Sequence, residues 1–164
     1  MVDPAMECAY RIRRATVEDA AVIARHRVGM FRDMRVMVEV EAPLLETAAH
    51  AYLLATLSTG EYLGWLVEHD SGVVAGGGVI LRALLPRPGH ADGGEEAYVL
   101  NVYTEPPHRR RGLARRLMNE ILDWCHARGA LRITLHASDE GRPLYEDLGF
   151  VQTNEMRLDA RGLA

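Results

Sequence analysis

The first third of the chain shows one short alternating pattern followed by two helical ones. Polar and apolar residues alternate over 10–15, which predicts a short strand. Thr16 followed by two acidic residues is typical of a helix start, and apolar side chains then recur at near-helical spacing through about residue 34. A second helix is predicted over 43–57, stopped by Ser-Thr-Gly at 58–60, with an apolar face at Leu44, Ala48, Ala51, Leu54 and Ala55.

The remaining pattern alternates between strands and helices. Residues 62–69 and 73–84 are rich in strand-forming side chains, and the intervening Asp-Ser-Gly indicates a hairpin. A further strand is expected over 97–104, then a helix over 113–128 in which Leu113, Leu117, Ile121 and Cys125 repeat every four residues. A strand, a short helix and a last strand complete the prediction, at 131–137, 141–148 and 150–158. The whole pattern predicts an α/β fold.

Size and composition narrow the class of protein. A chain of 164 residues with 48% hydrophobic content buries one sizeable core, so we expect a single domain over 1–164. The net charge is −4 and every basic residue is Arg, which makes nucleic acid a poor partner. Cys8 and Cys125 cannot form a disulfide framework, and the sequence has neither a signal-peptide pattern nor a membrane-spanning run. These features predict a cytoplasmic protein without membrane association.

Several familiar site patterns are excluded. The three glycines at 76–78 suggest a dinucleotide-binding loop, but the pattern requires glycine at 81, where Leu81 stands. A chain without lysine has no P-loop lysine. The seven histidines show no paired metal-ligand spacing, so no metal site is expected.

The junction between the strand over 97–104 and the helix over 113–128 has the features of an anion site. A helix N-terminus offers backbone N–H groups without intrahelical partners and about half a positive charge. Gly112 allows close approach of an anion, and Ala114 keeps the first turn small. Five arginines surround this point: Arg109, Arg110, Arg111, Arg115 and Arg116. Taken alone, such a run is more often a solvated helix start in which Gly112 serves only as a turn.

Two motifs resemble the GNAT acetyltransferase superfamily. Arg109, Gly112 and Ala114 match its pyrophosphate-binding motif of Arg or Gln, two variable residues, Gly, one variable residue, then Gly or Ala. Residues 144–150, Leu-Tyr-Glu-Asp-Leu-Gly-Phe, resemble its closing segment. The resemblance implies a mixed, mostly antiparallel twisted sheet flanked by helices, with a cofactor cleft where the fourth and fifth strands splay apart.

The resemblance also implies roles for individual residues in binding acetyl-CoA. In such enzymes the fourth strand bulges and its free backbone groups bind the pantetheine arm, which here would be done by Val102, Tyr103 and Thr104. The pyrophosphate would lie on the loop formed by Arg109, Arg110, Arg111, Gly112, Leu113, Ala114 and Arg115. Ser138 stands where many relatives carry Asn and could hydrogen-bond the pantetheine. Tyr145 matches the position whose hydroxyl protonates the departing CoA thiolate, although its ring could instead only pack in the helix face.

The implied reaction is direct attack of an amine on the thioester in a ternary complex, because no cysteine or serine is placed as a covalent relay. A base must take a proton from the amine, and Glu96 is the predicted candidate among Asp33, Glu96 and Glu105. The acceptor is a small-molecule or peptide amine that the sequence does not identify. A non-catalytic acyl-CoA-binding sensor is the alternative function, and a homodimer stays open.

Overall fold

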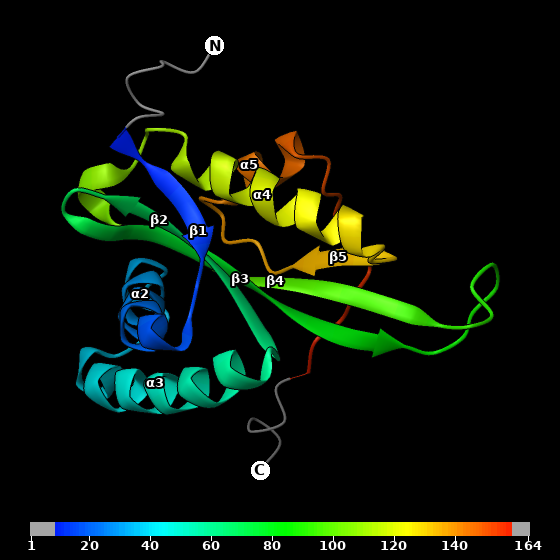
Figure 1. Cartoon of the computed structure of the whole chain (residues 1–164), viewed down its shortest axis with the longest axis horizontal. Coiled ribbons are helices and arrows are strands. Elements are labelled where there is room, and N and C mark those ends of the chain that lie inside the picture. Colours follow the sequence, from blue (N-terminus) through cyan, green and yellow to red (C-terminus); the bar gives the residue numbers. More distant parts are fainter. Residues whose placement is uncertain (1–8, 159–164) are drawn as a thin grey trace.

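The computed structural model of this chain describes residues 9–158, so Cys8 lies outside the described residues. Five strands form one sheet in the order β1 to β5: β1 (Arg11–Arg14), β2 (Tyr62–His69), β3 (Gly72–Leu84), β4 (Gly94–Thr104) and β5 (Arg132–Leu135). Neighbouring strands are antiparallel except β4 and β5, which are parallel. Figure 1 shows the long β3–β4 hairpin crossing the molecule. The predicted mixed, mostly antiparallel sheet is confirmed.

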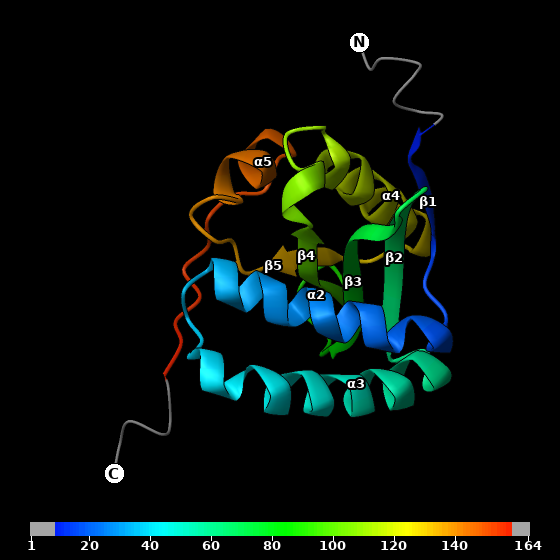
Figure 2. The same cartoon turned by 90° about the vertical axis from the view of Figure 1, so that its left-hand side faces the viewer.

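Helices cover both faces of the sheet (Figure 2). One face carries α2 (Ala20–Asp33) and α3 (Ala42–Thr59), preceded by the short 3-10 turns η1 (Val17–Asp19) and η2 (Glu39–Glu41). The other face carries α4 (Leu113–Arg128), which follows η3 (Pro106–His108). The short α5 (Arg142–Asp147) follows β5. No helix in the described part of the chain is long and apolar enough to cross a membrane.

The core has one part on each face of the sheet. Against α4, the fully buried side chains include Val67, Val79, Leu117, Ile121 and Cys125, which confirms the four-residue repeat read from this helix. Against α2 and α3, the sheet buries Tyr62 and Leu66. The glycine run of β3 serves this packing: a Cβ on Gly78 would lie 2.2 Å from the Tyr62 ring, and one on Gly77 within 3.3 Å of the α4 side chains.

Two sequence predictions are wrong. The predicted apolar face of α3 is its outer face, with Leu44 75% exposed, whereas Ala49, Leu53 and Thr56 are buried. This helix is apolar on nearly all sides, so its spacing did not select a face. Residues 150–158 form no strand: Val151, Met156 and Leu158 are exposed and pair with no strand of the described chain. A strand requires a neighbouring strand to supply hydrogen bonds, and no strand of the described chain supplies them to this segment.

Candidate active site

A bulge interrupts β4 at Asn101. Gly78 pairs with Leu100 and Gly76 with Tyr103, so two residues of β4, Asn101 and Val102, lie opposite Gly77 alone. Asn101 has φ 57°, a left-handed conformation that Asn tolerates better than most residues. The side chains on either side keep the normal alternation, with Val102 beside the α4 residues and Tyr103 beside Gly29 and His26 of α2. Asn101 is thus an added residue, and its side chain lies on the α2–α3 face.

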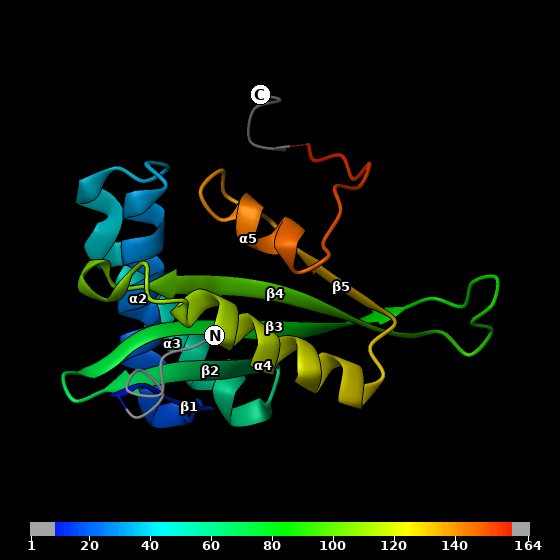
Figure 3. The same cartoon turned by 90° about the horizontal axis from the view of Figure 1, so that it is seen from above.

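The parallel strands β4 and β5 separate just before this bulge. Their pairing runs from Glu96 with Arg132 to Val99 with Leu135 and then stops. Figure 3 shows β5 diverging from β4 toward the end where β4 leads into η3. The β5-facing edge of residues 100–104 therefore pairs with no strand of the described chain, and an extended ligand could add to it as a further strand.

The N-terminus of α4 lies at the end of this free edge and is uncapped. Gly112 is its N-cap residue, with φ 72° and no side chain to occupy the N–H groups. The first intrahelical bond runs from the Arg116 N–H to the Gly112 carbonyl, at 3.1 Å, so the three N–H groups between them have no intrahelical acceptor. A Cβ at Gly112 would have no atom within 4 Å, which shows that the space before the helix is open.

The five arginines of this region point in different directions. Arg109 donates from Nε to the Thr104 carbonyl at 2.9 Å and pairs with Asp33 of α2, so its guanidinium braces the end of β4. Arg115 pairs with Asp147 of α5 at 2.8 Å, and Arg116 donates to the Tyr10 carbonyl at 3.2 Å. Arg110 and Arg111 are exposed and form no ion pair within residues 9–158. Only these two cationic side chains are unengaged near the open helix end.

Ser138 and Tyr145 follow β5 and lie on its side of the gap between the two parallel strands. The Ser138 Oγ accepts a hydrogen bond from the Gly141 N–H at 3.1 Å, which fixes the turn before α5. Tyr145 packs edge-to-face on Phe150 with ring centroids 6.0 Å apart. Burial raises the pKa of the Tyr145 hydroxyl, so this group is protonated at neutral pH. The ring therefore has the packing role considered from sequence and also carries a proton.

Glu96 lies in the paired part of β4, away from the bulge. Its two carboxylate oxygens are 3.3 Å from Arg132 and 3.7 Å from Arg82, and its side chain is 13% exposed. Asn101 lies five positions further along the extended strand, a span of roughly 16 Å. Both observations weigh against direct contact between Glu96 and an amine at the bulge, and its role as the base stays a prediction.

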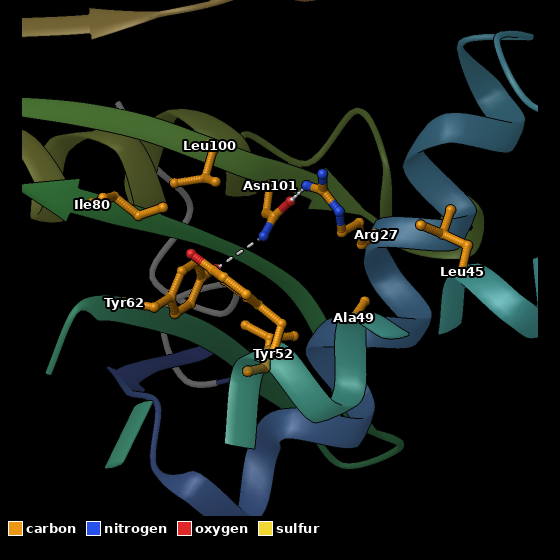
Figure 4. Close-up of a pocket in the computed structure, with 9 residues that line it drawn as sticks. Arg27, Leu45, Ala49, Tyr52, Tyr62, Ile80, Leu100 and Asn101 are labelled. Atoms are coloured by element: carbon orange, nitrogen blue, oxygen red, sulfur yellow. Dashed lines mark hydrogen bonds between the residues drawn. The ribbon is translucent and has the colours of Figure 1, made fainter. Parts of the chain in front are cut away.

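A pocket of about 330 Å³ lies beside the bulge, between the sheet and the α2–α3 pair (Figure 4). Arg27 of α2 donates from Nη1 to the Asn101 Oδ1 at 2.5 Å, and the Asn101 Nδ2 donates to the Tyr62 hydroxyl at 3.3 Å. Burial raises the pKa of Tyr62 to about 12. The other lining residues are Leu45, Ala49, Tyr52, Leu53, Ile80 and Leu100.

Sequence reasoning did not single out Arg27 or Tyr62. Arg27 stands on the apolar stripe of α2, between Ala24 and Phe31, where a charged residue interrupts the buried face. That interruption was a readable signal. The sequence contained no such signal for Tyr62, because its ring fits against Gly78 and its hydroxyl contacts Asn101, which lie on two other strands.

A charged contact anchors α2 to the end of β4. The His26 Nε2 lies 3.2 Å from the Glu105 Oε1, and Arg25 lies 3.6 Å from the same oxygen. Burial lowers the pKa of His26, which favours its neutral form. Glu105, the other acid considered near β4, is thus engaged with α2 side chains.

Comparison with known proteins shows to which family this architecture belongs. The profile described as "Acetyltransferase (GNAT) family" matches residues 15–150. A GCN5-related N-acetyltransferase from Ralstonia eutropha JMP134 superposes with a TM-score of 0.84 at 31% identity, covering 93% of this chain and 99% of that one. A predicted acetyltransferase with acetyl-CoA from Clostridium acetobutylicum superposes at 0.83 with 23% identity, covering 93% and 97%. A glucosamine-6-phosphate N-acetyltransferase from Arabidopsis thaliana shares the fold at 0.66 and 17% identity, covering 92% and 97%. The chain belongs to the GNAT acetyltransferase family.

Proposed function

We propose that this protein is an acetyl-CoA-dependent N-acetyltransferase that transfers the acetyl group directly to an amine. The observation that carries the proposal is the continuity between the unpaired edge of β4 and the uncapped N-terminus of α4. An extended pantetheine arm would bind the backbone of Val102, Tyr103 and Thr104. The pyrophosphate would then lie on the N–H groups of 110–115, with Arg110 and Arg111 adding positive charge.

The chemistry follows from where charge develops. The amine lone pair attacks the thioester carbonyl carbon, the C–N bond forms, and the C–S bond breaks with its electron pair leaving on sulfur. A backbone N–H at the bulge would stabilise the negative charge on the carbonyl oxygen. The thiolate, whose conjugate thiol has a pKa of about 8.5, takes a proton from the Tyr145 hydroxyl, and the tyrosinate regains a proton from solvent water. Burial of Tyr145 keeps that proton in place until the sulfur departs.

Two side chains complete the proposed machinery. The Ser138 hydroxyl accepts the Gly141 N–H and still has its own proton to donate to an amide of the pantetheine. Glu96 would receive the proton of the amine through intervening water, since its position along β4 weighs against direct contact with an amine at the bulge.

The test measures CoA thiol release from acetyl-CoA with a panel of amines: amino acids, amino-acid amides, polyamines, aminoglycosides, and peptides with free N-termini. We expect turnover with one class, an N-acetylated product by mass spectrometry, and initial-rate plots that intersect as in a ternary complex. Acetyl-CoA binding with no turnover on any amine would favour the sensor function. Parallel initial-rate plots would refute direct attack.

A further inference from the structure

The pocket beside the bulge carries a positive charge that no acidic side chain balances. Arg27 is its one charged lining residue, and none of the other lining residues is acidic. Figure 4 shows the Arg27 guanidinium reaching Asn101 from α2, with Tyr62 on the other side of the Asn101 amide. Because the bulge residue itself lines this pocket, an acceptor bound here lies beside the backbone where the thioester would be attacked.

Arg27 differs from the other arginines of its helix. Arg25 pairs with Glu105 at 3.6 Å and Arg32 pairs with Glu39, whereas Arg27 forms no ion pair within residues 9–158. Its contacts are one hydrogen bond to the neutral Asn101 and the Phe31 ring, 4.7 Å from the guanidinium carbon. A guanidinium has five N–H donors in a fork that matches a carboxylate, so most of its donors stay available for a ligand.

The rest of the pocket limits the size and polarity of the ligand. Besides Arg27, Asn101 and two tyrosines, its walls are aliphatic: Leu45, Ala49, Leu53, Ile80 and Leu100. A volume of about 330 Å³ is near the lower end of the range for ligand sites. Such a space fits one apolar side chain and its attached polar groups.

We infer that the acceptor is a free amino acid with an aliphatic or aromatic side chain, whose carboxylate binds Arg27 and whose amine faces the bulge. This inference rests on the proposed function and names the substrate class of the same site. A partly desolvated cation without a counter-charge is costly, and a carboxylate on the ligand removes that cost. Polyamines, which carry several positive charges and no negative one, are disfavoured.

The decisive comparison uses L-leucine and L-phenylalanine against their amides, which keep the side chain and the amine but lose the carboxylate. We expect wild-type kcat/KM to be at least about 100-fold higher for the acids, consistent with a charge-assisted pair in a desolvated site. Arg27→Met is expected to lower kcat/KM for the acids about 100-fold, mainly through KM, and to leave the amides within threefold. Arg25→Met, on the same helix and outside the pocket, is the matched control and should leave the acid-to-amide ratio unchanged.

Binding without turnover separates this inference from the proposed function. Calorimetry with CoA present should show binding of N-acetyl-L-leucine to the wild type and its loss in Arg27→Met. That result without turnover on any amine would refute acetyl transfer and keep the assignment of the pocket. Equal rates for acids and amides, or preferred turnover of spermidine, would overturn the acceptor class and leave acetyl transfer standing. An equal loss of acids and amides in Arg27→Met would show that Arg27 only braces Asn101.

Discussion

Gly112 offers a direct test of the proposed anion site, because two isosteric replacements there differ only in charge. The residue has φ 72° and serves as the N-cap of α4. Asn and Asp both tolerate left-handed backbone and are both favoured N-caps, so each should preserve the fold of the free protein. Either side chain would extend into open space, since a Cβ at this position has no neighbour within 4 Å. Only Gly112→Asp adds a negative charge where the pyrophosphate would lie.

The expected loss of acetyl-CoA affinity follows from the negative charge that Gly112→Asp adds. At about 4 Å, two unit charges repel by about 1 kcal/mol in water and about 4 kcal/mol near a protein surface. The Kd for acetyl-CoA should therefore rise between about fivefold and about 1,000-fold in Gly112→Asp relative to Gly112→Asn. At a ligand concentration of 100 times Kd, wild-type protein gains about 2.7 kcal/mol, and a 100-fold weaker variant gains about 0.4 kcal/mol.

Thermal unfolding measures this difference directly. For a chain of this size the wild-type gain corresponds to a Tm increase of about 5–10 °C with acetyl-CoA, against about 1 °C for Gly112→Asp. Gly112→Asn should retain more of the increase, and the Tm values of the two ligand-free variants should agree within a few degrees. Equal increases in the Asn and Asp variants would refute the assignment of the pyrophosphate to this loop.

Three further outcomes are expected. Tyr145→Phe should lower kcat about 100-fold at neutral pH and leave acetyl-CoA binding unchanged. The loss should shrink above about pH 8.5, where the thiolate is stable without a proton. Full activity of this variant at pH 7 would show that Tyr145 has only a packing role. Glu96→Gln should lower kcat by less than the about 100-fold typical of a directly contacting base, and an unchanged kcat would leave Glu96 only its ion pairs. Arg13 donates to both Asp19 oxygens at 2.7 and 2.8 Å and holds the pKa of Asp19 below its usual value. An acid whose pKa is lowered on folding stabilises the fold at pH values above its unfolded-state pKa, and this contribution is lost as the pH falls through its folded-state pKa. Asp19→Asn should therefore cost about 1–3 kcal/mol in urea unfolding at pH 7, and the cost should shrink progressively as the pH falls below about 4. A cost that is constant with pH would contradict this reasoning.

The elements that the sequence predicted well are those with local boundary signals. The helix Leu113–Arg128 has its predicted bounds because Gly112 and Gly129 both adopt left-handed backbone at its ends. The strand Tyr62–His69 also matches, since Gly60 precedes it and a hairpin turn follows. The inner face of α3 was misassigned because it is decided by contacts with α2 and β2, and a helix with apolar residues on most sides carries no periodic signal of them.

The candidate site shows the same difference between local features and features that several elements form together. The loop over 109–115 is a local feature, so the sequence together with the family resemblance could single it out as the predicted anion site. The sequence did not show that Arg109, Arg115 and Arg116 are held by other elements. The pocket beside Asn101 joins side chains of α2, α3, β2, β3 and β4, and no short segment contains its pattern. Arg27 became meaningful only when the structure showed which residue it contacts.

In the proposed reaction, the bulge allows one strand, β4, to contact both the acceptor and the cofactor. Val102 and Tyr103 keep the alternation that a strand without Asn101 would have, so the free edge beyond the bulge remains an extended backbone for the cofactor. Asn101 has no place in that alternation, and its side chain joins Leu100 in the pocket. The added residue thus supplies a polar contact for Arg27 without disturbing the packing of β4 against α4. In the proposed reaction, acceptor and cofactor would meet where the chain departs from regular pairing, with the acceptor against α2 and the cofactor along the free edge of β4 and the start of α4.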